Sequence, residues 1–89
     1  MATLALQADE RVLDVQFDDD YLVVALQDGR RISVPLEWYP RLARATPMQR
    51  ANWELCGGGY GMHWPDLDED LSTEGLLRGA PAPVTERAR

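Results

Sequence analysis

The residues able to do chemistry gather in one stretch of the chain, residues 57–70. It holds four of the seven glycines, the single histidine His63, and four carboxylates between Asp66 and Asp70. A histidine near carboxylates is the combination used in general acid–base catalysis, because imidazole titrates close to neutral pH. Glycine runs are typical of loops that bind phosphate. The spacing of the residues decides whether either chemistry is supported.

The glycine cluster does not have the spacing of a phosphate-binding loop. A P-loop needs a lysine followed by serine or threonine after its last glycine, whereas Met62 and His63 follow Gly61. The dinucleotide-binding spacing G-x-G-x-x-G, counted from Gly57 and Gly59, places Met62 at its last position. We therefore predict a tight hairpin at the glycines, in which the backbone approaches a neighbour closely.

The acidic run does not complete a calcium loop. An EF-hand loop starting at Asp66 needs glycine at its sixth position and glutamate at its twelfth, but Leu71 and Leu77 stand there. Ordinary solvated acids are one interpretation, and a docking patch for a basic partner is the other. The acids predicted to contact a partner are Asp66, Asp68, Glu69 and Asp70.

His63 lacks a nucleophile that the sequence links to it. A lone histidine between Met62 and Trp64 is more often structural, so we predict no catalytic residue, no cofactor and no metal ligand. An enzyme centred on His63 and residues 66–70 stays as a third hypothesis.

A second group of residues combines aromatic rings with arginine. Trp38, Tyr39 and Arg41 are neighbours, with Arg44 and Arg50 close in sequence. The rings can belong to the core of a small domain. They can also anchor a protein interface, where Trp, Tyr and Arg contribute most of the binding energy. We predict partner contacts at Trp38, Tyr39 and Arg41.

Charge and length limit the classes of function. The 89 residues make one small domain, with a net charge of −6 and nine cations that are all arginine. Nucleic acid is an unfavoured partner for such a chain alone, because lysine and arginine must neutralise phosphates. The single cysteine, Cys56, excludes an internal disulfide and is predicted to be buried. The chain shows no signal peptide and no apolar run of membrane length, so we expect a cytoplasmic protein with no membrane contact.

The elements that must position these residues begin with three predicted strands. Residues 12–17 alternate, with Leu13, Val15 and Phe17 on one face, and residues 21–26 are rich in β-branched side chains. Asp28 and Gly29 then signal a hairpin. A three-residue loop is preferred to a two-residue one, because it pairs Val24 with Ile32 and Leu22 with Val34 and so places the larger apolar set on one face. Pro35 lacks an N–H and should end the third strand or lie at an edge of the sheet.

Short helices and a hairpin are predicted for the rest of the chain. Residues 36–44 form a short helical segment, and Thr46, Pro47 and Gln49 begin a second helix with a capping box. Residues 53–56 and 60–64 form a hairpin around the glycines, and a final helical turn begins at Ser72 or Thr73 and closes at Gly79. The predicted fold class is α+β, with a small antiparallel sheet: a three-strand meander, then short helices, then a two-strand hairpin. The folded domain spans residues 11–79, between flexible termini at 1–10 and 80–89.

Several blocks of the sequence resemble a known bacterial family, catalogued as domain of unknown function 2442. The resemblance covers residues 12–77. The blocks that carry it are VLDV at 12–15, DGR at 28–30, ISVPL at 32–36, WYPRL at 38–42, NWE at 52–54, GYGMHWP at 59–65, LDEDLS at 67–72 and GLL at 75–77. The resemblance implies no catalytic activity that transfers to this chain. It implies small bacterial proteins, some fused to a helix-turn-helix domain and others encoded beside a second small protein, in an arrangement similar to toxin–antitoxin pairs.

From these observations we expect a non-enzymatic protein-binding module, antitoxin-like or the regulatory partner of a neighbouring gene product. The alternative is a nucleic-acid-linked transcriptional regulator that uses the arginine-bearing segment 36–53. An exposed strand edge is compatible with a symmetric dimer.

Overall fold

The N-terminal half of the chain forms an antiparallel meander. In this computed structural model, which describes residues 7–79, strands β1 (Val12–Phe17), β2 (Tyr21–Leu26) and β3 (Arg31–Pro35) pair in the order β1-β2-β3. Residues 1–6 and 80–89, which include most of the predicted flexible termini, lie outside the described part of the chain. Within the predicted N-terminal segment, the backbone N–H of Asp9 donates to Asp28 Oδ2 at 2.8 Å.

The turns of the meander follow from local side-chain chemistry. Asp18 Oδ1 accepts from the backbone N–H groups of Asp20 and Tyr21, at 2.8 and 2.7 Å, and so closes the first turn. At the second turn the register pairs Val24 with Ile32, which confirms the predicted three-residue loop. Gly29 has φ +98, a left-handed conformation that favours glycine.

The predicted core face of β1 is wrong at Leu13. Its side chain is 59% exposed, whereas Val12 and Val15 are buried. The register against β2 shifts between Val12 and Asp14, which is the signature of a β-bulge. A bulge inserts an extra residue and turns the side chains before it to the other face, so the simple alternation does not hold at the start of the strand.

Three short helical segments follow the meander. They are η1 (Leu36–Trp38), α1 (Pro40–Ala43) and α2 (Pro47–Ala51). The single helical segment predicted for 36–44 is interrupted at Tyr39, which has φ −126 and ψ 83. The cause is Pro40, since a residue before proline is disfavoured in the helical region. The predicted capping box is confirmed, with Thr46 Oγ1 accepting from the Gln49 N–H at 3.1 Å.

The C-terminal half forms a second antiparallel sheet. Strand β4 (Glu54–Cys56), the glycine turn η2 (Gly57–Gly59) and strand β5 (Gly61–Trp64) make the predicted hairpin. Strand β6 (Glu69–Ser72) adds a third strand, in the order β4-β5-β6. The sequence analysis predicts only the two-strand hairpin, so β6, which contains the acids Glu69 and Asp70, is an addition to it. Helix α3 (Thr73–Arg78) follows, capped by Ser72 and closed by Gly79.

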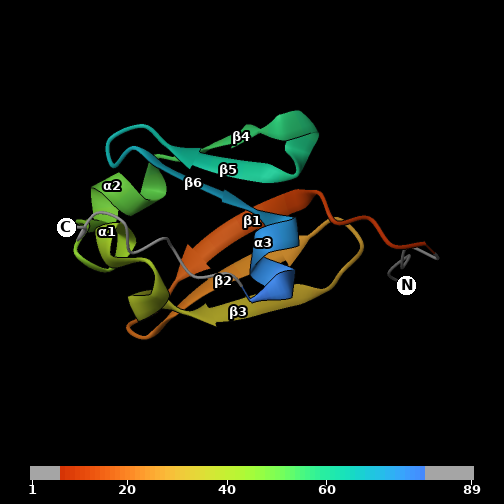
Figure 1. Cartoon of the computed structure of the whole chain (residues 1–89), viewed down its shortest axis with the longest axis horizontal. Coiled ribbons are helices and arrows are strands. Elements are labelled where there is room, and N and C mark those ends of the chain that lie inside the picture. The colour runs from red at the N-terminus through yellow and green to blue at the C-terminus, as the bar shows by residue number, and fades with distance from the viewer. Residues whose placement is uncertain (1–6, 80–89) are drawn as a thin grey trace.

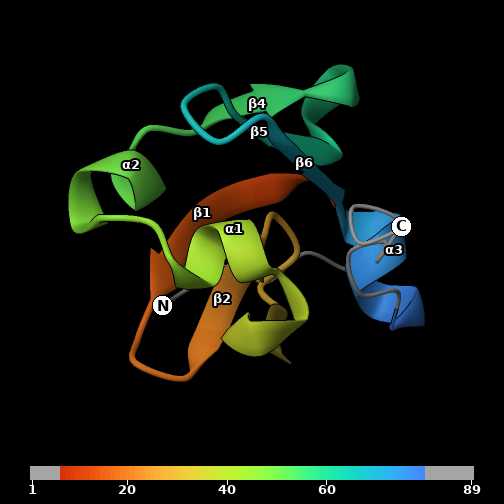
Figure 2. The same ribbon diagram turned by 60° about the vertical axis from the view of Figure 1, so that its left-hand side comes forward.

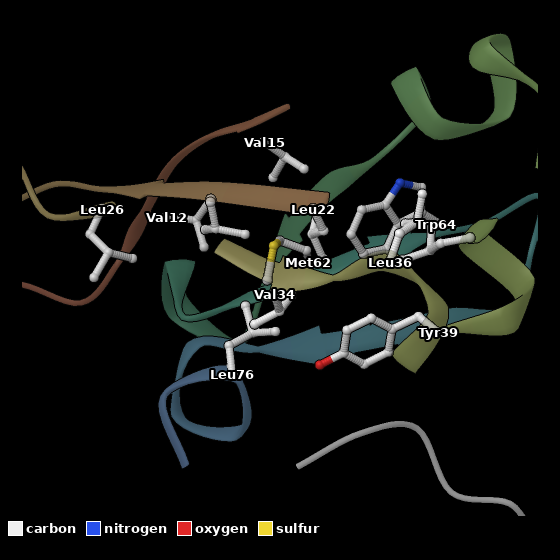
Figure 3. Packing of buried hydrophobic residues seen from close by; sticks show 12 residues of the cluster. Val12, Val15, Leu22, Leu26, Val34, Leu36, Tyr39, Met62, Trp64 and Leu76 are labelled. Atoms are coloured by element: carbon white, nitrogen blue, oxygen red, sulfur yellow. The ribbon is translucent and has the colours of Figure 1, made fainter. Parts of the chain in front are cut away.

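The two sheets pack on each other and enclose one core. Figure 1 shows β4-β5-β6 lying across β1-β2-β3, with α1 and α2 at one end. Figure 2 shows α2 and α3 on opposite sides of the sheets. Met62 and Trp64 from β5 lie beside Leu22 and Val34 from the first sheet (Figure 3). The predicted α+β class, with a three-strand meander followed by short helices and strands, is confirmed.

Candidate functional site

Two regions predicted separately to contact a partner meet in the structure. Arg41 on α1 donates from Nη1 to the backbone carbonyl oxygen of Asp68, in the turn between β5 and β6, at 2.5 Å. The two residues are 27 positions apart in sequence. Asp68 has φ +53, a left-handed conformation that aspartate tolerates better than most residues. The arginine-bearing segment and the acidic turn therefore form one surface.

A second bond fixes the other side of this turn. Asn52, the C-cap residue of α2, donates from Nδ2 to Asp66 Oδ2 at 3.0 Å. Leu67 lies between the two aspartates and packs against the core. We call the area made by Arg41, Asn52, Asp66 and Asp68 the mixed surface. It is held in place from α1, α2 and the core.

The aspartates of the mixed surface are available to a cation. Both are exposed, and within residues 7–79 neither carboxylate lies within ion-pair distance of an arginine. The ion pairs of the described chain use other acids, at Asp9, Glu10, Asp28, Asp70 and Glu74. The carboxylates of Asp66 and Asp68 therefore present negative charge to solvent.

Trp38, the last residue of η1, supplies an aromatic ring beside the end of α3, where its Cη2 lies 3.9 Å from the place that a Cβ on Gly79 would take. Its side chain is half-buried, and its ring meets Tyr39 edge-to-face with a centroid distance of 6.4 Å. The buried part packs against the core, and the rest faces solvent. A rigid, partly exposed indole is the kind of group that anchors protein interfaces.

Tyr39 and Glu69 are not surface residues, so their prediction as partner contacts is wrong. Tyr39 is 1% exposed and Glu69 is 7% exposed. Glu69 pairs with Trp64 in the β5–β6 register and shares its inward face. Burial raises the pKa of Tyr39, and the negative charge of Glu69 raises it further. A period of two in β6 explains the error, since successive acids of a strand point to opposite faces.

Asp70 lies apart from the mixed surface, on the outer face of the second sheet. Its Oδ1 is 2.6 Å from His63 Nδ1, and the two residues are directly opposite in the register. On the other side of His63, β4 places Glu54 opposite it. His63 is thus set between two acids on an open face, and it is only partly buried.

Cys56 shares this outer face with His63. Its predicted burial is wrong, because β4 is an edge strand and leaves the thiol exposed. Partial desolvation raises the pKa of Cys56, and the charges of Asp70 and Glu54 add to the effect. A raised pKa keeps the thiol protonated, which is the opposite of the activation that a cysteine nucleophile needs. No three metal-ligating side chains among residues 7–79 are arranged to hold a metal ion.

A groove that the sequence did not predict lies between the first turn and α2. Its volume is about 500 Å³, and residues from β1, the turn and α2 line it, among them Phe17, Asp18, Asp19, Pro47, Arg50 and Ala51. The Arg50 guanidinium lies 5.3 Å from the centre of the Phe17 ring. The two walls are 28 or more positions apart in sequence (Asp19 to Pro47). No local pattern of spacing could have brought them together.

The fold and the site together define a small α+β domain of two antiparallel sheets that presents a mixed-charge surface. The chain belongs to the family described as protein of unknown function DUF2442, which matches residues 12–82 and confirms the resemblance drawn from the sequence. None of the curated proteins compared with the chain matches it.

Two solved structures are similar to this fold. One is the crystal structure of a protein of unknown function from Rhodospirillum rubrum, 31% identical, with a TM-score of 0.69, covering 84% of this chain and 93% of that one. The other is the solution structure of an uncharacterized protein from Chromobacterium violaceum, 26% identical, with a TM-score of 0.70, covering 88% of this chain and 73% of that one. Within the part of the chain that the structure describes, no helix has the length and apolar character needed to cross a membrane.

Proposed function

We propose that this protein is a non-enzymatic protein-binding module of the bacterial cytoplasm, acting as the antitoxin-like or regulatory partner of a small basic protein encoded by a neighbouring gene. The observation that carries the proposal is the bond between Arg41 and the Asp68 carbonyl. It joins the arginine-bearing segment, which also carries Trp38 at the end of η1, to the turn that bears Asp66 and Asp68.

The charges of the mixed surface favour a basic partner. Asp66 and Asp68 are exposed and form no ion pair with the other described residues, so a partner's arginine or lysine can approach them without breaking an internal pair. The net charge of −6 attracts a basic protein at long range and raises the rate of encounter. Trp38 supplies the apolar contact that charges alone cannot give.

Co-expression with the neighbouring gene product tests this function. We expect a stable complex at low salt, of defined stoichiometry by size-exclusion chromatography with light scattering. Trp38→Ala should weaken the complex by about tenfold or more, as loss of an interface tryptophan does. Tyr60→Ala is the control, since it removes an exposed ring at the glycine turn between β4 and β5, at the other end of the molecule from α1 and α2 (Figure 1). No complex at low salt, or equal loss in both variants, would contradict the proposal.

The alternative, a nucleic-acid-linked regulator using residues 36–53, draws little support from the geometry. The Arg41 guanidinium donates to the backbone carbonyl oxygen of Asp68. The Arg50 guanidinium donates to the carbonyl oxygens of Leu42 and Ala43. The helical segments there have three, four and five residues, far shorter than a helix that reads a DNA groove. This alternative would be supported by DNA binding that depends steeply on salt and is lost on charge reversal at Arg41, Arg44 and Arg50.

A further inference from the structure

The groove between the first turn and α2 has an apolar floor held in one position. Phe17 meets Trp64 edge-to-face, with ring centroids 6.2 Å apart, and Trp64 is fully buried. The centre of the Phe17 ring also lies 5.3 Å from the guanidinium carbon of Arg50. Arg50 is itself fixed, because Nε donates to the Leu42 carbonyl at 2.9 Å and Nη2 to the Ala43 carbonyl at 3.0 Å. The floor therefore needs little reordering to receive a side chain, which favours binding.

The mouth of the groove is acidic at one end. Asp18 and Asp19 line it, and within residues 7–79 neither carboxylate forms an ion pair. Asp18 uses Oδ1 for the backbone of the turn, so its position is fixed. Pro47 and Ala51 form the apolar wall on α2. Arg50 also lines the groove, where its bonds to the Leu42 and Ala43 carbonyl oxygens fix the position of its positive charge.

We propose that this groove receives a segment of a partner protein in which an apolar side chain stands next to an arginine or lysine. The apolar side chain packs on Phe17 between Pro47 and Ala51, and the cation pairs with Asp18 and Asp19. A segment with an acidic residue at that place would meet two carboxylates and be rejected, so charge complementarity selects the occupant. A volume of about 500 Å³ accommodates a few side chains of such a segment.

This inference deepens the proposed function by adding a second contact and stating its chemistry. It rests on that function only for the identity of the protein that carries the segment. The groove and the mixed surface flank α2, since Ala51 lines the groove and the next residue, Asn52, holds Asp66. One basic protein lying across α2 can therefore occupy both.

A synthetic peptide that alternates leucine with arginine tests the groove on the isotope-labelled full chain. We expect NMR amide shifts at Gln16, Asp19 and Ala51, beside any shifts that the peptide's arginines cause at the mixed surface. Asp19→Asn should lower the affinity for the peptide by about two- to fivefold, which is the range expected for loss of an exposed ion pair. Asp20→Asn is the matched control, because it removes the same charge from the same turn outside the groove, and it should leave the affinity unchanged. Ala51→Arg, which adds bulk and positive charge to the wall, should abolish the shifts of the groove residues.

Three results would overturn the groove proposal: shifts at the mixed surface alone, equal loss in Asp19→Asn and Asp20→Asn, or equal binding of a peptide with serine in place of leucine. The last would show general attraction between opposite charges only. Failure of the groove is distinguishable from failure of the proposed function. If the neighbouring protein binds and Ala51→Arg leaves that binding unchanged, the proposed function is supported and the groove proposal is contradicted. If the peptide occupies the groove but no complex forms with that protein, the reverse holds.

Discussion

Trp64 connects the core to α2 through a single side chain. It is fully buried, and its Nε1 donates to the Arg50 carbonyl oxygen at 3.0 Å. Arg50 is also the residue whose guanidinium lies 5.3 Å from the centre of the Phe17 ring. Burying a large ring while satisfying its one polar atom stabilises the fold and positions the groove together.

Replacing Trp64 by phenylalanine should therefore destabilise the domain strongly. Trp64→Phe leaves the Arg50 carbonyl without its donor and opens a small cavity, and the unsatisfied group alone costs about 1–3 kcal/mol. Urea denaturation measures the change as a lower midpoint at an unchanged slope. Trp38→Phe is the control, since Trp38 is half-exposed and its indole makes no hydrogen bond to the other described residues. An equal loss in both variants would contradict this role for Trp64.

Asp28 gives stability that depends on pH. Its carboxylate accepts from the Arg30 side chain and from the backbone N–H groups of Asp9 and Arg30, and these bonds lower its pKa. Because the folded pKa lies below the unfolded value of about 3.9, the contribution is full above that pH. It is lost as the pH falls from there toward the folded pKa.

Asp28→Asn should thus lower the free energy of unfolding at about pH 7 and matter least in acid. Urea unfolding at a series of pH values measures the gap between wild type and variant. Asp20→Asn controls for the loss of a charge in a turn, because Asp20 forms no ion pair within residues 7–79. A gap that widened as the pH fell would have the wrong sign for this explanation.

Among the helices, strands and turns, the structure confirms the predictions that depend on residues close together in sequence. Thr46 and Gln49 form the predicted capping box, and Gly29 takes the left-handed turn, because both depend on neighbours in sequence. Strand β6 was missed because Glu69 and Asp70 have poor strand propensity, and only pairing with β5 makes them a strand. Leu13 was misplaced by a bulge that no periodicity reveals.

The backbone of the glycine hairpin lies close to its neighbours at Gly61. A Cβ added at Gly61 would lie 2.8 Å from Cys56 Sγ and 3.3 Å from the Leu71 carbonyl oxygen. Gly61→Ala should destabilise the second sheet, by about 1–3 kcal/mol, as overpacking does. In a Cys56→Ala background the worst contact is absent, so the same substitution should cost less. A double-mutant cycle in urea checks this, and strict additivity would contradict the close contact.

At the scale of the whole molecule, the surface depends on contacts between distant parts of the chain. Trp38, Arg41, Asp66 and Asp68 are exposed or half-exposed, as a partner contact requires, and their role stays a prediction. That Arg41 reaches Asp68 was beyond sequence reasoning, since the bond spans 27 positions and requires both sheets to be folded. The groove arises in the same way, from a turn and a helix that meet only in the folded domain.

In the proposed function, the exposed carboxylates of Asp66 and Asp68 bind a basic protein. Isothermal titration of the neighbouring gene product against the double variant Asp66→Asn/Asp68→Asn tests it most directly. The matched control is Asp14→Asn/Glu74→Gln, which changes the net charge equally at exposed positions on β1 and α3. We predict that the first variant weakens binding by about tenfold and reduces its salt dependence, while the control stays near wild type. Equal loss of affinity in the two variants would show that net charge alone, rather than this surface, attracts the partner. That result would contradict the proposed role of Asp66 and Asp68.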